Sequence, residues 1–364
     1  MSTRRLYPPL EEVRSILVLR PNAVGDFIYA LPCLYALRAT YPQARIVYIG
    51  KQWHADFLAD RPGPIDEVLV IPPCPGVGAA PDAQVDAQAV ESFVASLRGR
   101  RFDLALQIYG GGRYSNPFLK RIGARLTIGM RAADAEPLDR WVHYGPLQQR
   151  RLQLLEVAAL AGAQPVLAER ELSLTARDRA GAARVLPPAD ERPLVLIQPG
   201  ASDPRRRWDP ARFAAVADRL AAQGMQVAVN GTEEEGPVVR AVLAQMRAPA
   251  LDLTGRLSLS GLCGVLERAA LLVSNDTGPL HLALALGTPV VGIYWLTNLI
   301  EAAPLHHAGH RALLATRTHC PQCGQDNYRQ RCAHDPSFVD DVQVDEVAAA
   351  AQDLLAESER ASSE

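Results

Sequence analysis

Lysine is nearly missing from this sequence of 364 residues, since only Lys51 and Lys120 among its 38 basic residues are lysines. Cationic contacts in the C-terminal half must therefore be made by arginine. A strong net charge is missing as well, because the formal value is −2. A nucleic-acid-binding domain normally presents a basic face, so we expect no nucleic-acid partner.

Long apolar runs are also missing. No stretch reaches the roughly 18 apolar residues that a helix needs to span a bilayer, and the first residues, MSTRRLYPPLEEVRS, lack the apolar core of a signal peptide. Six cysteines stand in a chain large enough to need no disulfide bonds. These absences predict a cytoplasmic protein.

Short runs of branched apolar residues alternate with helical patterns along the chain. Such alternation predicts parallel sheets covered by helices. The expected strands are 16–20, 45–50, 67–71 and 103–108, followed by 193–198, 226–230, 271–274 and 289–294. We expect helices at 210–224, 278–286 and 344–355, and a helix near 27–37 that starts late or bends at Pro32.

The strand and helix pattern restarts near residue 192, after a charged segment that contains Pro187 and Pro188. We therefore predict two α/β domains. Their expected limits are 1–183 and 193–340, with a linker at 184–192 and a final helix and tail at 341–364. Ligands of parallel sheets bind beyond the carboxyl ends of the strands, where this sequence places loops with Gly25, Gly200 and Gly278.

The first of these loops reads RPNAVGDFI over residues 20–28. It has neither the lysine of a P-loop nor the glycines of a dinucleotide-binding turn. Asp26 is then either a helix N-cap or a catalytic carboxylate, and the loop alone leaves both interpretations open.

The second loop, PGASDPRRRW over 199–208, places three consecutive arginines between a strand and a helix. Guanidinium groups at such a position suit phosphate oxygens. The alternative is a solvated charged turn with Trp208 packed beneath it.

The third loop, SNDTGPLHLA over 274–283, leads into a helix at Gly278. Backbone N–H groups near Asp276, Thr277 and Gly278 could seat a diphosphate at the helix N-terminus. His281 lies one turn further, where a histidine more often packs or supports a neighbour than acts as a base.

Taken together, the three loops resemble those of glycosyltransferase family 9, the ADP-heptose:lipopolysaccharide heptosyltransferases. The matching residues are Arg20, Gly25–Asp26 and Leu31–Pro32, then Pro199–Gly200 and Arg206–Trp208, and then 276–283. The resemblance runs over about residues 14–340 and implies a GT-B fold, in which two Rossmann-like α/β domains face each other across a cleft. It also implies an N-terminal acceptor domain, a C-terminal nucleotide-sugar domain and a last helix that crosses back.

The resemblance also implies roles for individual residues. Asp26 corresponds to the general base, and Arg206 stands where the family has a diphosphate-binding lysine. The residues expected to bind the nucleotide sugar are Gly25, Ser202, Arg206, Arg207, Glu234, Glu235, Leu257, Asp276, Thr277, Gly278 and His281.

The implied activity is an inverting transfer of heptose from ADP-heptose to a lipopolysaccharide core or related glycan, without a catalytic metal. Alternatives are another nucleotide sugar, a protein or natural-product acceptor, and a non-catalytic nucleotide-sugar-binding module. Acceptor recognition is expected in the loops 74–88 and 110–116. Peripheral contact with the inner membrane could involve basic residues of the first domain, or these could be ordinary solvated side chains: Arg98, Arg100, Arg101, Lys120, Arg121 and Arg125.

Three of the cysteines lie close together in a stretch that also holds two histidines. Cys320, Cys323, Cys332 and His334 could form a structural zinc site of the Cys3His type. Against this, the second Cys-x-x-Cys pair of a zinc ribbon is missing. Free or redox-active thiols are the alternative.

Overall fold

The computed structural model describes residues 7–166, 170–187, 192–305 and 308–363. The chain divides into two compact units, Met1–Glu171 and Leu172–Glu364, called here the first and the second unit. Across the described residues, no helix combines the length and the apolar character needed to cross a membrane.

The first unit contains a parallel sheet with the spatial order β3-β2-β1-β6-β7-β8. Its strands are β1 (Ser15–Leu19), β2 (Arg45–Gly50), β3 (Glu67–Val70), β6 (Leu104–Gln107), β7 (Leu126–Arg131) and β8 (Arg140–His143). Two short strands, β4 (Cys74–Pro75) and β5 (Gly78–Ala79), pair with each other outside this sheet. The strand order reverses between β1 and β6, as in Rossmann-like folds, and ligands bind near such a reversal.

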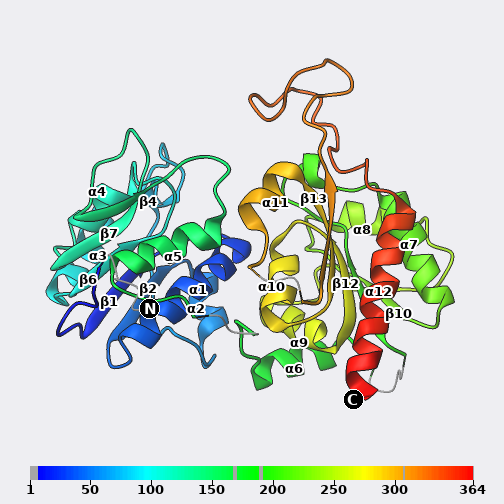
Figure 1. The fold of residues 1–364 in the computed structure, drawn as a ribbon, viewed down its shortest axis with the longest axis horizontal. Helices are drawn as coiled ribbons and strands as arrows, with labels where there is room; N and C mark the ends of the chain where they lie inside the picture. The colour runs from blue at the N-terminus through cyan, green and yellow to red at the C-terminus, as the bar shows by residue number, and fades with distance from the viewer. Residues whose placement is uncertain (1–6, 167–169, 188–191, 306–307, 364) are drawn as a thin grey trace, which may run out of the picture. The chain divides into compact units, whose positions relative to one another are not determined.

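Helices connect these strands and lie against the sheet (Figure 1). They are α1 (Val24–Thr40), α2 (Gln52–Leu58), α3 (Ala87–Gly99), α4 (Ser115–Lys120) and α5 (Arg150–Leu160). Residues 16–19 of β1 are fully buried, which explains their unbroken apolar run. Helix α1 begins at Val24 and continues through Pro32, so the late start is wrong and the proline lies inside the helix.

The second unit repeats the arrangement with the order β11-β10-β9-β12-β13-β14, again all parallel. The strands are β9 (Leu194–Gln198), β10 (Gln226–Val229), β11 (Leu251–Asp252), β12 (Ala269–Asn275), β13 (Val290–Trp295) and β14 (His310–Ala315). The helices are α6 (Ala176–Ala183), the short 3-10 turn η1 (Pro204–Arg206), α7 (Pro210–Ala222), α8 (Gly236–Leu243), α9 (Leu259–Arg268), α10 (Gly278–Leu286), α11 (Leu296–Ala302) and α12 (Val344–Ser363). Here the order reverses between β9 and β12, so the loops that follow these two strands lie side by side.

Helix α12 completes the core of the second unit. It packs against α7 and against β12, β13 and β14, and Val347, Ala351 and Leu354 are buried there. Figure 1 shows this helix, in red, lying along the unit. The return of the last helix to the N-terminal domain stays a prediction.

The two α/β domains are confirmed, and the predicted strands appear within one or two residues of their expected ends. The division lies between Glu171 and Leu172, ahead of the predicted linker 184–192, because α6 packs on α9. Residues 188–191 of that linker lie outside the described residues. The sequence pattern missed β4, β5, β7, β8, β11 and β14.

Candidate functional site

Asp26 lies in the first turn of α1, directly beyond the carboxyl end of β1. It is not the N-cap, because Ala23 occupies that position. The Asp26 side chain is 39% exposed, and its Oδ1 accepts a hydrogen bond from Arg20 Nη2 at 3.0 Å. The capping interpretation of Asp26 is therefore wrong, and a half-exposed carboxylate at the strand-order reversal remains.

Arg20 holds the Asp26 carboxylate in position through hydrogen bonds. The Arg20 side chain is buried; its Nε donates to the Asp26 carbonyl oxygen at 2.7 Å, and its Nη1 donates to the Ile108 carbonyl oxygen. One guanidinium group thus ties the end of β6 to both the backbone and the side chain of Asp26. The sequence motif contains Arg20 but does not indicate this positioning contact, which the structure shows.

The three consecutive arginines after β9 have three different sets of partners. Arg205 forms a fork with the Asp203 carboxylate at 2.7 Å, and Arg207 Nε donates to the Ala201 carbonyl oxygen at 2.8 Å. Arg206 alone among them reaches the end of β12, where its Nη1 lies 3.1 Å from Asp276 Oδ2. Two of the arginines therefore shape the loop, and Arg206 presents a cation beside the third loop.

Arg206 belongs to a chain of four polar groups. Its Nη2 donates to Ser202 Oγ at 3.0 Å, while the other oxygen of Asp276 lies 2.9 Å from His281 Nε2. Asp276 and His281 are buried. Burial alone would raise the pKa of the Asp276 carboxyl, but the hydrogen bonds and charges of His281 and Arg206 outweigh it and hold that pKa below its ordinary value.

Helix α10 begins next to this chain of groups. Thr277 is its N-cap, and the Thr277 hydroxyl makes no capping hydrogen bond. Gly278 and Pro279 form the first helical positions. Backbone N–H groups and the positive end of the helix dipole therefore lie beside Arg206, an arrangement that favours an anion.

Glu235 is the acidic residue that approaches the second loop. Its Oε2 accepts hydrogen bonds from the Thr232 N–H at 3.0 Å and from Gln198 Nε2 at 3.4 Å. A Cβ on Gly200 would collide with the Glu235 carboxylate, which explains why glycine stands there. Glu234 is exposed, and Leu257 lies half-buried in the loop before α9.

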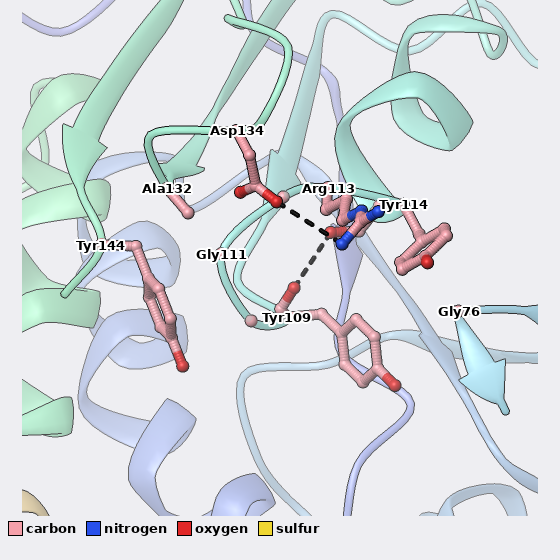
Figure 2. A pocket seen from close by; sticks show the side chains of 11 residues that line it. Gly76, Tyr109, Gly111, Arg113, Tyr114, Ala132, Asp134 and Tyr144 are labelled. Carbon is pink, nitrogen blue, oxygen red and sulfur yellow. Dashed lines mark hydrogen bonds and ion pairs between the residues drawn. The ribbon is translucent and has the colours of Figure 1, made fainter. Parts of the chain in front are cut away.

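A pocket of about 300 Å³ opens in the first unit, beyond the carboxyl ends of β6 and β7 (Figure 2). The glycines 110–112 line it, and Tyr109, Tyr114 and Tyr144 contribute aromatic rings. Arg113 and Asp134 lie 3.7 Å apart at the rim. Gly76 also lines the pocket, so the two loops expected to recognise an acceptor, 74–88 and 110–116, contribute to one cavity.

Comparison with known proteins agrees with the resemblance noted in the sequence. Residues 90–332 match the profile of glycosyltransferase family 9 (heptosyltransferase). The chain belongs to this family. Lipopolysaccharide heptosyltransferase 2 of Salmonella typhimurium is 28% identical over 330 residues, covering 84% of this chain and 89% of that protein.

Two solved structures share the fold of this family 9 glycosyltransferase. A family 9 glycosyltransferase from Veillonella parvula has a TM-score of 0.81 at 20% identity, covering 96% of this chain and 99% of the other. ADP-heptose lps heptosyltransferase II of E. coli has a TM-score of 0.74 at 20% identity, with 95% and 99% covered. The expected GT-B class of α/β fold is confirmed.

The cysteines at the C-terminal end of this family 9 enzyme do form a cluster. One ligand atom from each of Cys320, Cys323, Cys332 and His334 lies within 4.8 Å of all the others; we call these residues the Cys/His cluster. The side-chain hydrogen bond of Asn327, together with those of His334 and Cys320, lowers the pKa of Cys332 to about 6, against the opposing effect of burial.

Acidic residues pair with much of the basic surface of the first unit that was a candidate for membrane contact. Arg100 pairs with Glu67, Lys120 with Glu136, and Arg121 with Glu91. Arg98 donates to the Arg121 carbonyl oxygen, and Arg125 lies 4.0 Å from Asp103. The net positive charge of this surface is thus smaller than the sequence indicated.

Proposed function

We propose that this family 9 enzyme is an inverting heptosyltransferase, which moves heptose from ADP-heptose to a lipopolysaccharide core or a related glycan. The observation that carries the proposal is the position of Arg206, held by Asp276 and Ser202 at the N-terminus of α10. A guanidinium group beside a helix N-terminus fits the diphosphate of such a donor. Relatives named lipopolysaccharide heptosyltransferases support the choice of sugar and acceptor.

In this proposal, the second unit binds the donor. The diphosphate accepts hydrogen bonds from Arg206, Ser202 and the backbone at Thr277 and Gly278. Glu235 takes the ribose hydroxyls, and the backbone near Leu257 meets the adenine. As the bond from the anomeric carbon to ADP breaks, negative charge grows on the phosphate oxygens and these fixed positive groups stabilise it.

Asp26 acts as the general base for the acceptor. Its carboxylate takes the proton of the attacking hydroxyl, while that oxygen forms a bond to the anomeric carbon on the face opposite ADP. One displacement of this kind inverts the anomeric configuration. Arg20 holds Asp26 in one orientation and leaves the side chain 39% exposed, so the carboxylate is accessible to a substrate.

Fixed cations and helix dipoles supply the charge stabilisation that a divalent ion gives in other glycosyl transfers. The proposed reaction therefore requires no catalytic metal. Any ion bound by the Cys/His cluster would be structural.

The pocket of the first unit is proposed as part of the acceptor site. Tyrosine rings suit the apolar faces of sugars, and Arg113 suits a phosphate or carboxylate substituent of the acceptor. We also propose that the enzyme is cytoplasmic and contacts the inner membrane peripherally. The basic surface of the first unit would make this contact, with the smaller positive charge that its acidic partners leave.

The decisive experiment is incubation with ADP-heptose and a core acceptor that lacks heptose, followed by mass spectrometry. We expect the acceptor to gain the mass of one heptose, and NMR of the product to show the anomeric configuration opposite to that of the donor. Parallel incubations with UDP- and GDP-linked sugars test the alternative donors. Tight ADP-heptose binding without transfer to any acceptor would favour a non-catalytic binding module instead.

A further inference from the structure

We propose that Cys320, Cys323, Cys332 and His334 bind one zinc ion in a tetrahedral site. The ion would hold together the long loop before α12, residues 316–343. The four ligand atoms lie within 4.8 Å of one another. Around zinc, bonds of about 2.0–2.3 Å place tetrahedral ligand atoms about 3.7 Å apart. Cys320 Sγ and His334 Nδ1 are already 3.8 Å apart, so small shifts complete the site.

The first two ligands come from a tight chelating turn. The Gly324 N–H donates to the Cys320 carbonyl oxygen at 2.9 Å, and the Cys320 N–H donates to the Gln325 carbonyl oxygen at 2.9 Å. Gly324 has φ +72°, a left-handed conformation that glycine adopts without strain. This turn places the sulfurs of Cys320 and Cys323 on the same side of the chain.

The other two ligands come from a second short segment, which hydrogen bonds tie to the first. The Cys332 N–H donates to Asn327 Oδ1 at 3.2 Å, and Asn327 Nδ2 donates to Cys332 Sγ at 3.4 Å. Donors directed at sulfur are the outer contacts that stabilise thiolate ligands.

The loop has almost no apolar core to hold it in one conformation. Residues 316–343, all of them described, form no helix or strand beyond an isolated bridge between His319 and Asp326. Figure 1 shows this loop, in orange, standing away from the helices and strands of its unit. Between residues 317 and 335, only Cys320 and Asn327 are buried. Ordered loops of this length without an apolar core commonly depend on a staple such as a metal.

The C-terminal end of the loop 316–343 contacts residues 199–208, called here the arginine loop, to which we assign the donor. The Phe338 N–H donates to the Arg205 carbonyl oxygen at 2.8 Å. Phe338 stacks on Trp295 with ring centroids 4.9 Å apart, and the Arg205 guanidinium lies 5.3 Å from the Trp295 ring centroid. Metal binding thus steadies a segment that supports Arg205, the neighbour of Arg206.

Metal content of the purified full chain tests the proposal directly. After growth with added zinc and purification under reducing conditions, mass spectrometry of the metals should give about one zinc per chain. Cys323→Ser and His334→Ala should each lower this content severalfold, while His334→Cys should retain it because thiolate is also a zinc ligand. His319→Ala is the matched control, since His319 lies beside the cluster without belonging to it, and should retain the zinc.

A second measurement tests the tetrahedral coordination and the alternatives to zinc, which are a disulfide and an iron site. Replacement of zinc by Co²⁺ should give the visible absorption of tetrahedral thiolate coordination in the wild type and in His319→Ala. The proposal is overturned if the wild type binds less than about a tenth of an equivalent of zinc after reconstitution, or if His334→Ala and Cys323→Ser bind as much as His319→Ala. A disulfide between cluster cysteines in the reduced preparation, or full occupancy by iron in preference to zinc, would also overturn it.

A link to nucleotide binding rests on the proposed function and is measured separately. Zinc-depleted protein should bind ADP about threefold to tenfold more weakly, because the support of the arginine loop is loosened. Zinc content, by contrast, does not depend on any activity. A chain that binds zinc yet transfers no heptose would refute the proposed function alone, and a transferring chain without zinc would refute the metal site alone.

Discussion

The two units have the same strand order and carry different chemistry at its reversal. In the first unit, the loops after β1 and β6 supply one half-exposed carboxylate and a pocket of glycine and tyrosine. In the second unit, the loops after β9 and β12 supply Arg206 and a helix N-terminus. The shared fold fixes where a ligand binds, and the loop residues decide which ligand fits.

Each unit has an aspartate that contacts an arginine, Asp26 in the first and Asp276 in the second, and the two differ in exposure. Both carboxylates contact an arginine at about the same distance, 3.0 Å for Asp26 and 3.1 Å for Asp276. Asp276 is 3% exposed, with its two oxygens used by Arg206 and His281, whereas Asp26 is 39% exposed. One aspartate is therefore suited to structure and the other to proton transfer.

The largest expected effect is on turnover when Asp26 is changed. Asp26→Asn should lower kcat by about a hundredfold or more, the typical contribution of a general base. ADP affinity should stay unchanged, because the loops to which we assign the donor belong to the second unit. Asp60→Asn, an exposed acid of the first unit, is the control. Near-normal turnover of Asp26→Asn would remove the base assignment.

Arg206→Ala should affect binding rather than proton transfer. Loss of a partly buried phosphate partner should weaken ADP binding by about 2–4 kcal/mol, as measured by isothermal titration calorimetry. Arg219→Ala removes an exposed pair with Asp345 and serves as the control. Unchanged ADP affinity would instead support the alternative that the arginine loop is a solvated charged turn without a phosphate-binding role.

Asp276→Asn should mainly change stability. Its pKa is lower in the folded chain, so the ionised form contributes stability that is fully present above about pH 4 and is lost as the pH falls through the lowered value. The variant should be about 2–3 kcal/mol less stable at neutral pH, since Arg206 then lacks its buried partner. Urea unfolding at pH 7 and pH 3 should show this difference shrinking in acid; Asp345→Asn should show little difference at either pH.

Arg20→Lys tests whether Arg20 positions Asp26. Lysine keeps the positive charge and loses the fork that holds both the backbone and the carboxylate of Asp26. We expect kcat to fall about tenfold with the KM for the donor unchanged. A change in donor KM alone, with kcat intact, would contradict a positioning role.

The smallest expected effect concerns the acceptor pocket. Tyr114→Ala removes a ring that is 39% exposed at the pocket wall. We expect the acceptor KM to rise about threefold to tenfold, the contribution of one partly exposed aromatic contact, with the donor KM unaffected. Tyr328→Ala, an exposed ring in the second unit, is the control.

Much of this architecture could be predicted from the sequence, because buried parallel strands are short, apolar and easily recognised. Helix α10 appeared with the expected ends, since Gly287 has the positive φ of a helix C-cap. The strands β8 and β14 were missed because each alternates more and less exposed residues instead of forming a fully buried run. For α1, Pro32 suggested a late start that is wrong, because the helix begins at Val24 and contains the proline; the alternative of a bend at Pro32 stays a prediction.

The site was less predictable, because side-chain partners depend on contacts between distant segments. The resemblance singled out Arg206, but nothing in the local sequence shows how its partners differ from those of Arg205 and Arg207; its contact with Asp276 does so. The role of Arg20 required the carbonyl of Ile108, which directly follows β6. Glu235 could be preferred to Glu234 only once Gly200 was seen to make room for it.

Residues near the end of the chain support the arginine loop, and this limits when the loop can fold during synthesis. Trp208 Nε1 donates to the Val342 carbonyl oxygen, 134 residues later in the chain, and Phe338 reaches back to Arg205. A growing chain emerges from the ribosome N-terminus first, so the loop after β9 is made long before the segment that supports it. The nascent polypeptide therefore acquires a finished arginine loop only after almost its entire length has been translated.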